Sequence, residues 1–279
     1  MSETTSPITG IAARDAWMGE HPWHPRIMPF AVYAVFLTLI DWVRPHAPGL
    51  YPAMYAAQCG VVLWLLWRYR KLIPELTLRF DWLALPVGAA VMLVWVVLGH
   101  WMVEQFPQCF AQHGPHYLQS MSPAARYVSL AMRLVGMSMI VPMLEEPLVR
   151  SLVLRSFHRA RPAGIAVVQL FGDMPVVGDW FMHTSPAKRA DRHDQPLGNM
   201  FDQTPLGKLS VFAVLISTLV FMSYHLMRDW PSAIVCSLAY CLLLAATKRK
   251  GLGPVIWAHG ITNALLWAYC VKTGDWQFL

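Results

Sequence analysis

Charged residues are scarce in this sequence of 279 residues. Asp, Glu, Lys and Arg together make up 14% of it, whereas soluble domains contain about 25%. Hydrophobic residues reach 56%, and the mean hydropathy is +0.40. This composition excludes an ordinary soluble domain and indicates a polytopic membrane protein.

Cysteine is also rare, and its pattern carries little information. The five cysteines are scattered, mostly inside apolar segments, and none forms a CxxC arrangement. No disulfide framework or cysteine-based zinc site is therefore expected. The sequence has no HExxH pattern, and the HxxH spacings at His21/His24 and His113/His116 lie among prolines and glycines. We expect no metal at either pair.

Seven apolar segments are long enough to cross the roughly 30 Å hydrocarbon core of a bilayer. They are residues 27–43, 51–67, 82–103, 127–154, 209–226, 231–247 and 252–271. The stretch 163–183 could be an eighth, but its Gly, Asp and Pro residues would place unpaired backbone and charge in lipid, so we predict an interfacial or re-entrant segment. The predicted fold is an all-α polytopic transmembrane helix bundle of seven to eight spans.

The basic residues predict how the bundle is oriented. With seven spans, 16 of the 22 Lys and Arg residues fall on the side that holds the N-terminal tail, and the positive-inside rule makes that side cytoplasmic. The tail lacks the features of a cleaved signal peptide. These loops explain the net charge of +6 and would attract anionic lipid headgroups, so no nucleic-acid partner is predicted.

Ionisable groups nevertheless occur inside three predicted spans. Each group at membrane depth costs about 2.5 to 3.5 kcal/mol on insertion scales, so such groups persist mainly where they pair or act. They belong to pairs four residues apart, which share one face of a helix. The pairs are Glu146/Arg150, Phe221/His225 and His259/Asn263.

Depth decides whether these groups can meet. Counting 1.5 Å per residue from the cytoplasmic edge places Glu145, His259 and His225 at depths of about 15, 13 and 24 Å. Helix tilt can absorb the difference of about 10 Å. We therefore expect all three side chains in the middle of the bilayer, with His225 deepest.

A carboxylate beside histidines and an asparagine in a water-poor cavity favours hydrolysis. Glu145 could take a proton from a water molecule that attacks a carbonyl group. Asn263 could donate a hydrogen bond to the resulting oxyanion, and a histidine could do the same or orient the water. Arg150 would pair with Glu146, which leaves Glu145 as the base. The residues alone do not decide which histidine serves the water.

Three alternatives remain open. Zinc could be held by Glu145, His225 and His259, which would supply three ligands and an open position; otherwise no cofactor is predicted. A proton-coupled transporter would use the same buried groups, but it predicts inverted repeats, and none is evident. A non-catalytic membrane scaffold, such as an immunity or assembly factor, would tolerate the loss of Glu145.

The three pairs also carry a family resemblance. EEPLVR at 145–150, FMSYH at 221–225 and HGITN at 259–263 resemble the EExxxR, FxxxH and HxxxN motifs of the CPBP family, the intramembrane glutamic endopeptidases related to the CAAX prenyl protease. The motifs occur in the family's order. The resemblance implies a catalytic core at 126–279, preceded by accessory transmembrane helices at 27–125 and a cytoplasmic tail at 1–26.

The resemblance also implies roles for these residues. In such a membrane peptidase, Glu145 and His225 activate water, while His259 and Asn263 stabilise the oxyanion. Glu146, Arg150 and Phe221 would support them. The implied partners are the lipid bilayer and a membrane-associated peptide or protein substrate.

Two further segments resemble a subgroup of this family. NMFDQTPLGKLSVF at 199–212 and VKTGDWQFL at 271–279 are similar to CAAX-protease-related proteins of exosortase-containing bacteria. This likeness implies a bacterial cytoplasmic (inner) membrane and exosortase-system proteins as partners. An insertion at 157–208 fits the subgroup and would cover the cytoplasmic mouth of the site.

The first motif departs from the family pattern in three places. Val149 and Ser151 stand where many members have an aromatic residue and a glycine. Pro147 lacks a backbone donor and should kink the helix near Met143.

Overall fold

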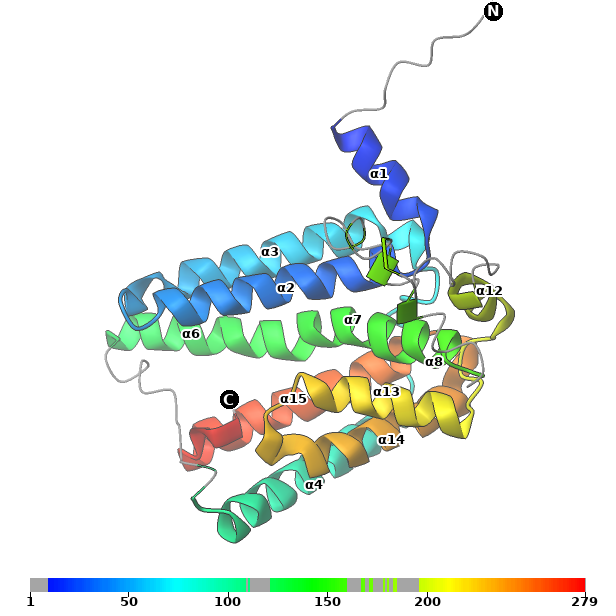
Figure 1. The fold of residues 1–279 in the computed structure, drawn as a ribbon. Coiled ribbons are helices and arrows are strands. Elements are labelled where there is room, and N and C mark those ends of the chain that lie inside the picture. Colours follow the sequence, from blue (N-terminus) through cyan, green and yellow to red (C-terminus); the bar gives the residue numbers. More distant parts are fainter. Residues whose placement is uncertain are drawn as a thin grey trace, which may run out of the picture.

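The computed structural model describes residues 10–108, 110, 121–159 and 196–278, together with a few residues between 167 and 184. Within these ranges the chain forms helices and no strands. A helix or helix series occupies each of the seven predicted spans, and these run side by side in a bundle (Figure 1). They are α2 (His24–Val43), α3 (Tyr51–Arg68), α4 (Ala84–Gln105), the series α6–α8 within Pro123–Ser156, α13 (Val211–Ser223), α14 (Trp230–Thr247) and α15 (Gly253–Thr273). The predicted all-α bundle is confirmed.

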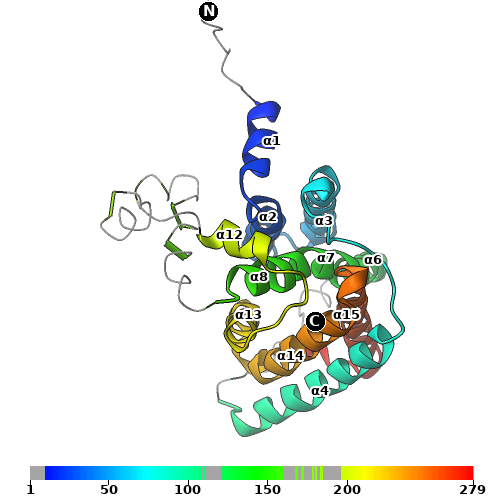
Figure 2. The same cartoon turned by 90° about the vertical axis from the view of Figure 1, so that its right-hand side faces the viewer.

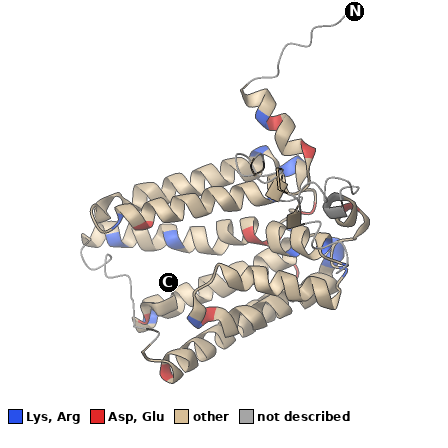
Figure 3. Ribbon diagram, viewed as in Figure 1, with Lys and Arg blue, Asp and Glu red and all other residues tan. Residues whose placement is uncertain are grey.

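Five of these helices are long and apolar enough to cross a membrane, which makes the chain a multi-pass membrane protein. Two others differ from them. α13 is strongly apolar but has 13 residues, about 20 Å at 1.5 Å per residue. α15 has 21 residues and includes the polar side chains of the third motif. Charged residues gather toward the two ends of the bundle (Figure 3).

The helix series that carries the first motif lies at the centre of the bundle. Figure 2 shows it between the pair α2 and α3 on one side and α13, α14, α15 and α4 on the other. Among the described residues, two short helices lie outside the bundle: α1 (Ile11–Glu20), which was not predicted, and α12 (Pro196–Gln203) in the insertion. Most of residues 160–195, including most of the stretch 163–183, and the pair His113/His116 lie outside the described residues.

Two π-helical pieces widen the central series. It consists of α6 (Pro123–Val135), the π-helix η3 (Gly136–Ile140), α7 (Val141–Glu146), the π-helix η4 (Pro147–Val153) and α8 (Leu154–Ser156). Pro142 lies two residues after the end of η3, and Pro147 is the first residue of η4. A proline has no N–H for the usual helical bond to the carbonyl four residues earlier. The sequence predicts a kink near Met143, and the structure has wide π-helical turns on both sides of α7, an arrangement often found at functional sites.

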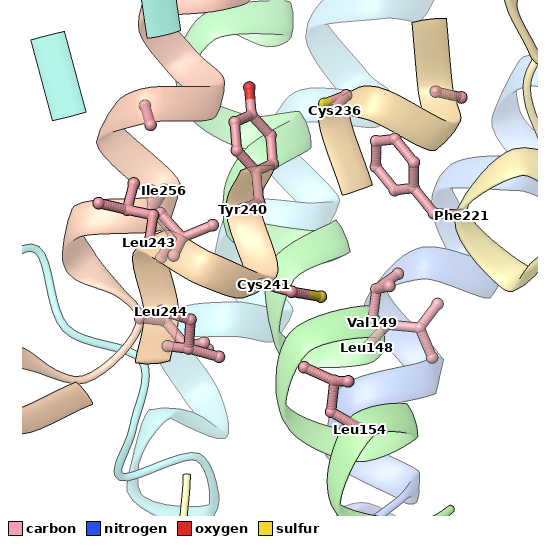
Figure 4. Packing of buried hydrophobic residues seen from close by; sticks show 14 of the residues in the cluster. Leu148, Val149, Leu154, Phe221, Cys236, Tyr240, Cys241, Leu243, Leu244 and Ile256 are labelled. Carbon is pink, nitrogen blue, oxygen red and sulfur yellow. The ribbon is translucent and has the colours of Figure 1, made fainter. Parts of the chain in front are cut away.

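The largest hydrophobic cluster joins the central series to α13, α14, α15 and α4 (Figure 4). Helix α4, which the sequence analysis placed among the accessory helices, packs along α15 and α14. The contact with α15 is close at Gly88, where an added Cβ would lie 2.6 Å from Ala258 O. Thr262 Oγ1 also donates to Gly88 O at 2.9 Å. Small residues that allow such close approach are typical of helix contacts in membranes.

Candidate active site

The two adjacent glutamates lie at the end of α7 and are both buried, but they have different partners. Glu146 is fully buried; its Oε1 accepts a hydrogen bond from His259 Nδ1 at 2.8 Å. Its Oε2 lies 3.6 Å from Arg150 Nε in an ion pair. Glu145 Oε2 accepts a hydrogen bond from Tyr224 OH at 3.2 Å. The structure contains the predicted pair of Glu146 and Arg150, and it adds His259 as a second partner.

Arg150 is held by the second motif as well as by Glu146. Its Nη1 donates to Ser217 Oγ at 3.2 Å. Its guanidinium carbon lies 4.9 Å from the centre of the Phe221 ring and 5.9 Å from that of Tyr240. A desolvated cation over aromatic rings is stabilised by about 2 kcal/mol or more. Phe221 therefore helps to hold the arginine of the first motif, which fits its predicted supporting position.

His225 lies in the turn that follows α13 and not on the helix itself. The prediction that Phe221 and His225 share one face of a helix is therefore wrong, because α13 ends at Ser223. The ring of His225 replaces a backbone donor: its Nδ1 lies 2.7 Å from Phe221 O. A carbonyl oxygen can only accept, so the proton lies on Nδ1, and Nε2 of the neutral ring is an acceptor.

Asn263 is joined to a carbonyl group of the π-helix η3. Its Nδ2 donates to Met137 O at 2.8 Å. Three residues earlier on α15, an added Cβ on Gly260 would fall on Ser138 O. These two carbonyls lie four and five residues before Pro142, which has no N–H to offer either of them. The proline and the glycine together bring Asn263 against the central series.

One cavity of about 320 Å³ collects the side chains that the sequence singled out for catalysis. Glu145, His225, His259 and Asn263 all line it, whereas Glu146, Arg150 and Phe221 do not. The sequence estimate placed His225 about 10 Å deeper than the others at 1.5 Å per residue. That count treated residues 209–226 as one helix, whereas α13 runs from Val211 to Ser223.

The structure adds three neighbours that the sequence analysis missed. Tyr224 donates a hydrogen bond to Glu145. Trp95 of α4 lines the cavity, and the centres of its ring and of the His225 ring lie 5.4 Å apart. Gln277 lines the cavity from the segment after α15. The only sequence signals were the position of Tyr224 beside a motif histidine and the position of Gln277 inside VKTGDWQFL.

Ser151, where many family members have glycine, has a partner that explains it. Its Oγ donates to Glu75 Oε1 in the loop between α3 and α4. Glu75 also receives two hydrogen bonds from Arg26, from Nε at 2.8 Å and from Nη2 at 2.9 Å. All three side chains are buried. Ser151 thus ties the motif helix to the segments that precede it in the chain.

The residues of the zinc alternative, Glu145, His225 and His259, do not form a metal cluster among the described residues. Among the residues that the structure describes, no group of three or more His, Cys, Asp or Glu side chains is placed to hold a metal ion. The Nδ1 atoms of His225 and His259 are both engaged in hydrogen bonds. A zinc ion would have to bind Nε2 of both rings together with Glu145, and a chelation experiment decides this alternative.

Comparisons with known proteins agree with the motifs. No curated protein and no solved structure matches the chain. Residues 197–265 match the family model described as type II CAAX prenyl endopeptidase Rce1-like. The matched part runs from α12 into α15 and contains the second and third motifs, whose side chains bond the first. This part of the chain is similar to the Rce1-like type II CAAX prenyl endopeptidases.

Proposed function

We propose that the chain is an intramembrane endopeptidase that cleaves a membrane-associated peptide or protein by means of a glutamate-activated water. The supporting observation is that Glu145, His225, His259 and Asn263, from three segments distant in sequence, line one cavity. The match to a peptidase family supports the same reaction class.

Glu145 acts as the general base. Tyr224 donates to its Oε2, so Oε1 is the oxygen available to a water molecule. His225 offers Nε2 as a second acceptor, because its proton is held at Nδ1 by Phe221 O. A water between these two acceptors gives one proton to Glu145, and its oxygen adds to the scissile carbonyl carbon. A positioned base of this kind contributes about 100- to 10,000-fold to the rate.

His259 and Asn263 stabilise the oxyanion that forms. Glu146 fixes the orientation of the His259 ring through Nδ1. Nε2, when it carries a proton, donates to the oxyanion. Asn263 uses one Nδ2 hydrogen for Met137 O and keeps the second for the oxyanion. When the C–N bond breaks, Glu145 returns its proton to the leaving nitrogen. The products are a carboxylic acid and an amine.

The proposed location is the bacterial cytoplasmic membrane, with the N-terminal tail in the cytoplasm. The basic loops support this orientation. The bilayer and a membrane-anchored substrate are the proposed partners. Exosortase-system proteins, which the resemblance of two segments implies, are proposed as further partners.

The decisive variant is Glu145→Gln, which removes the base and keeps a hydrogen-bonding group of the same shape. Its control is Glu104→Gln, an exposed carboxylate at the end of α4. Both proteins are purified and incubated with a peptide library in lipid nanodiscs. We expect cleavage by the wild type and by the control, and a loss of at least about 100-fold for Glu145→Gln.

Equal cleavage by Glu145→Gln and the wild type would contradict the role of the base. No cleavage by well-folded wild type, together with an unchanged cellular phenotype for Glu145→Gln, would favour the non-catalytic scaffold. Chelation separates the zinc alternative: activity that disappears with a chelator and returns with zinc would refute the metal-free mechanism.

A further inference from the structure

The segment after α15 turns back onto the bundle. Gly274 adopts the left-handed conformation with φ of 74°, and its N–H donates to Cys270 O. Asp275 N then donates to Thr273 Oγ1 at 3.2 Å. The reversal directs the short 3-10 helix η7 (Trp276–Phe278) toward α15 and α4.

Several bonds hold this segment in place. Asp275 Oδ2 lies 2.7 Å from His100 Nε2 on α4 and accepts from Gln277 Nε2 at 3.1 Å. Arg228, in the turn after α13, donates to Gln277 O. The ring of Phe278 fills the space beside Gly99, where any Cβ would collide with it. The segment therefore forms a wall that contacts α4, α15 and the turn beside His225.

Gln277 presents an unused acceptor in this wall. The side chain is 7% exposed and lines the same cavity as Glu145 and His225. Its Nε2 is assigned by the bond to Asp275, which can only accept, so Oε1 is the other atom of the amide. Among the described residues, Oε1 is buried and has no hydrogen-bond partner.

A buried acceptor without a partner costs about 1 to 3 kcal/mol. A substrate that supplies a donor recovers this energy on binding. An extended peptide offers a backbone N–H about every 3.3 Å along its length. A peptide in the cavity would therefore place such groups near Gln277 whatever its side chains are.

We propose that Gln277 is a substrate-binding residue whose Oε1 accepts a hydrogen bond from a backbone N–H of the peptide held in the cavity. This role rests on the proposed peptidase function. Asp275 and Arg228 position Gln277, and the wall they form sets one side of the peptide's path past Glu145. The subgroup-like segment VKTGDWQFL thereby becomes part of the binding site.

The test compares Gln277→Met, which keeps the length of the side chain and removes the acceptor, with Gln105→Met, an exposed glutamine at the end of α4. A library peptide cleaved by the wild type is the substrate. Loss of one neutral hydrogen bond is worth about 0.5 to 1.5 kcal/mol, so KM should rise about 2- to 13-fold while kcat changes less than about 2-fold. Gln105→Met should match the wild type.

A second measurement separates binding from a structural role. Peptide analogues with one backbone amide replaced by an ester lack a single N–H. Wild type should lose affinity at one particular position, and Gln277→Met should lose nothing further there. A wild-type pattern of ester sensitivity in Gln277→Met would overturn the proposal, since a water or another group would then satisfy Oε1.

The same comparison is made for binding alone in the Glu145→Gln background, with a fluorescent library peptide. Weaker binding by the Gln277→Met double variant supports the binding site even if no cleavage is ever found. Normal cleavage by the wild type with unchanged KM and binding in Gln277→Met refutes the role of Gln277 and leaves the peptidase function intact.

Discussion

Replacing Arg150 with methionine tests how much the buried ion pair of Arg150 and Glu146 stabilises the protein. Arg150 and Glu146 are both completely buried, and the two charged groups lie 3.6 Å apart. At an effective dielectric constant of about 20, unit charges at that separation attract by about 5 kcal/mol. Arg150→Met removes this attraction but leaves the carboxylate of Glu146 buried, with His259 as its remaining polar partner among the described residues.

Two magnitudes compete in this prediction. Interhelical hydrogen bonds in membranes contribute only about 0.6 kcal/mol on average. Leaving a buried charge without its ion-pair partner costs about 3 to 5 kcal/mol. The second should dominate, because both groups are shielded from water and Phe221 covers the guanidinium. Arg150→Met should therefore lower the free energy of unfolding by about 3 to 5 kcal/mol, and the double variant with Glu146→Gln by less than about 2 kcal/mol.

Unfolding in mixed micelles with increasing SDS provides the assay, and the 13 tryptophans give a strong fluorescence signal. Arg44→Met is the control, since Arg44 and Asp41 form an exposed pair at 3.0 Å and should be worth under about 1 kcal/mol. The reasoning fails if Arg150→Met costs no more than the control, or if the double variant costs the sum of both single changes.

Three further variants test neighbouring contacts. Gly260→Ala should cost about 1 to 3 kcal/mol in the same unfolding assay, whereas Gly60→Ala, where the added Cβ meets nothing within 4 Å, should not destabilise. Tyr224→Phe removes the donor to the proposed base and should lower kcat about 10-fold, at a cost of about 1 kcal/mol of stability; an unchanged kcat contradicts this. Ser151→Ala loses the bond to Glu75 and should cost about 1 kcal/mol of stability, with cleavage rates as in the wild type.

The positions of the seven helices or helix series of the bundle could be predicted because each lies in an apolar run. The end of α13 could not, since the apolar pattern continues to Leu226 while the helix stops at Ser223. The stop depends on the His225 ring, which bonds Phe221 O in place of a backbone donor. A side chain that competes with the backbone leaves no trace in hydrophobic periodicity.

The pair of Glu146 and Arg150 was likewise predictable, and the pair of Glu146 and His259 was not. Glu146 and Arg150 are four residues apart, so helical spacing alone predicts their contact. The bond between Glu146 and His259 spans 113 residues and depends on how two helices are rotated and tilted. Gln277 could not be found from the motifs at all, because it reaches the cavity only through the turn at Gly274.

Pro142 connects the irregular helix geometry to the proposed chemistry. A proline inside a helix costs about 3 kcal/mol or more, so Pro142→Ala should not destabilise the protein. The new N–H at this position, however, could bond the carbonyls of Ser138 or Met137, and Asn263 would then share its acceptor. We expect cleavage to fall about 10-fold, about the effect of one mispositioned hydrogen bond. Pro29→Ala in α2, another helix-interior proline, should leave cleavage unchanged. Full activity in Pro142→Ala would show that Asn263 keeps its position without the proline. A stable protein with impaired cleavage would show that the missing helical hydrogen bonds at Pro142 serve to position the oxyanion site.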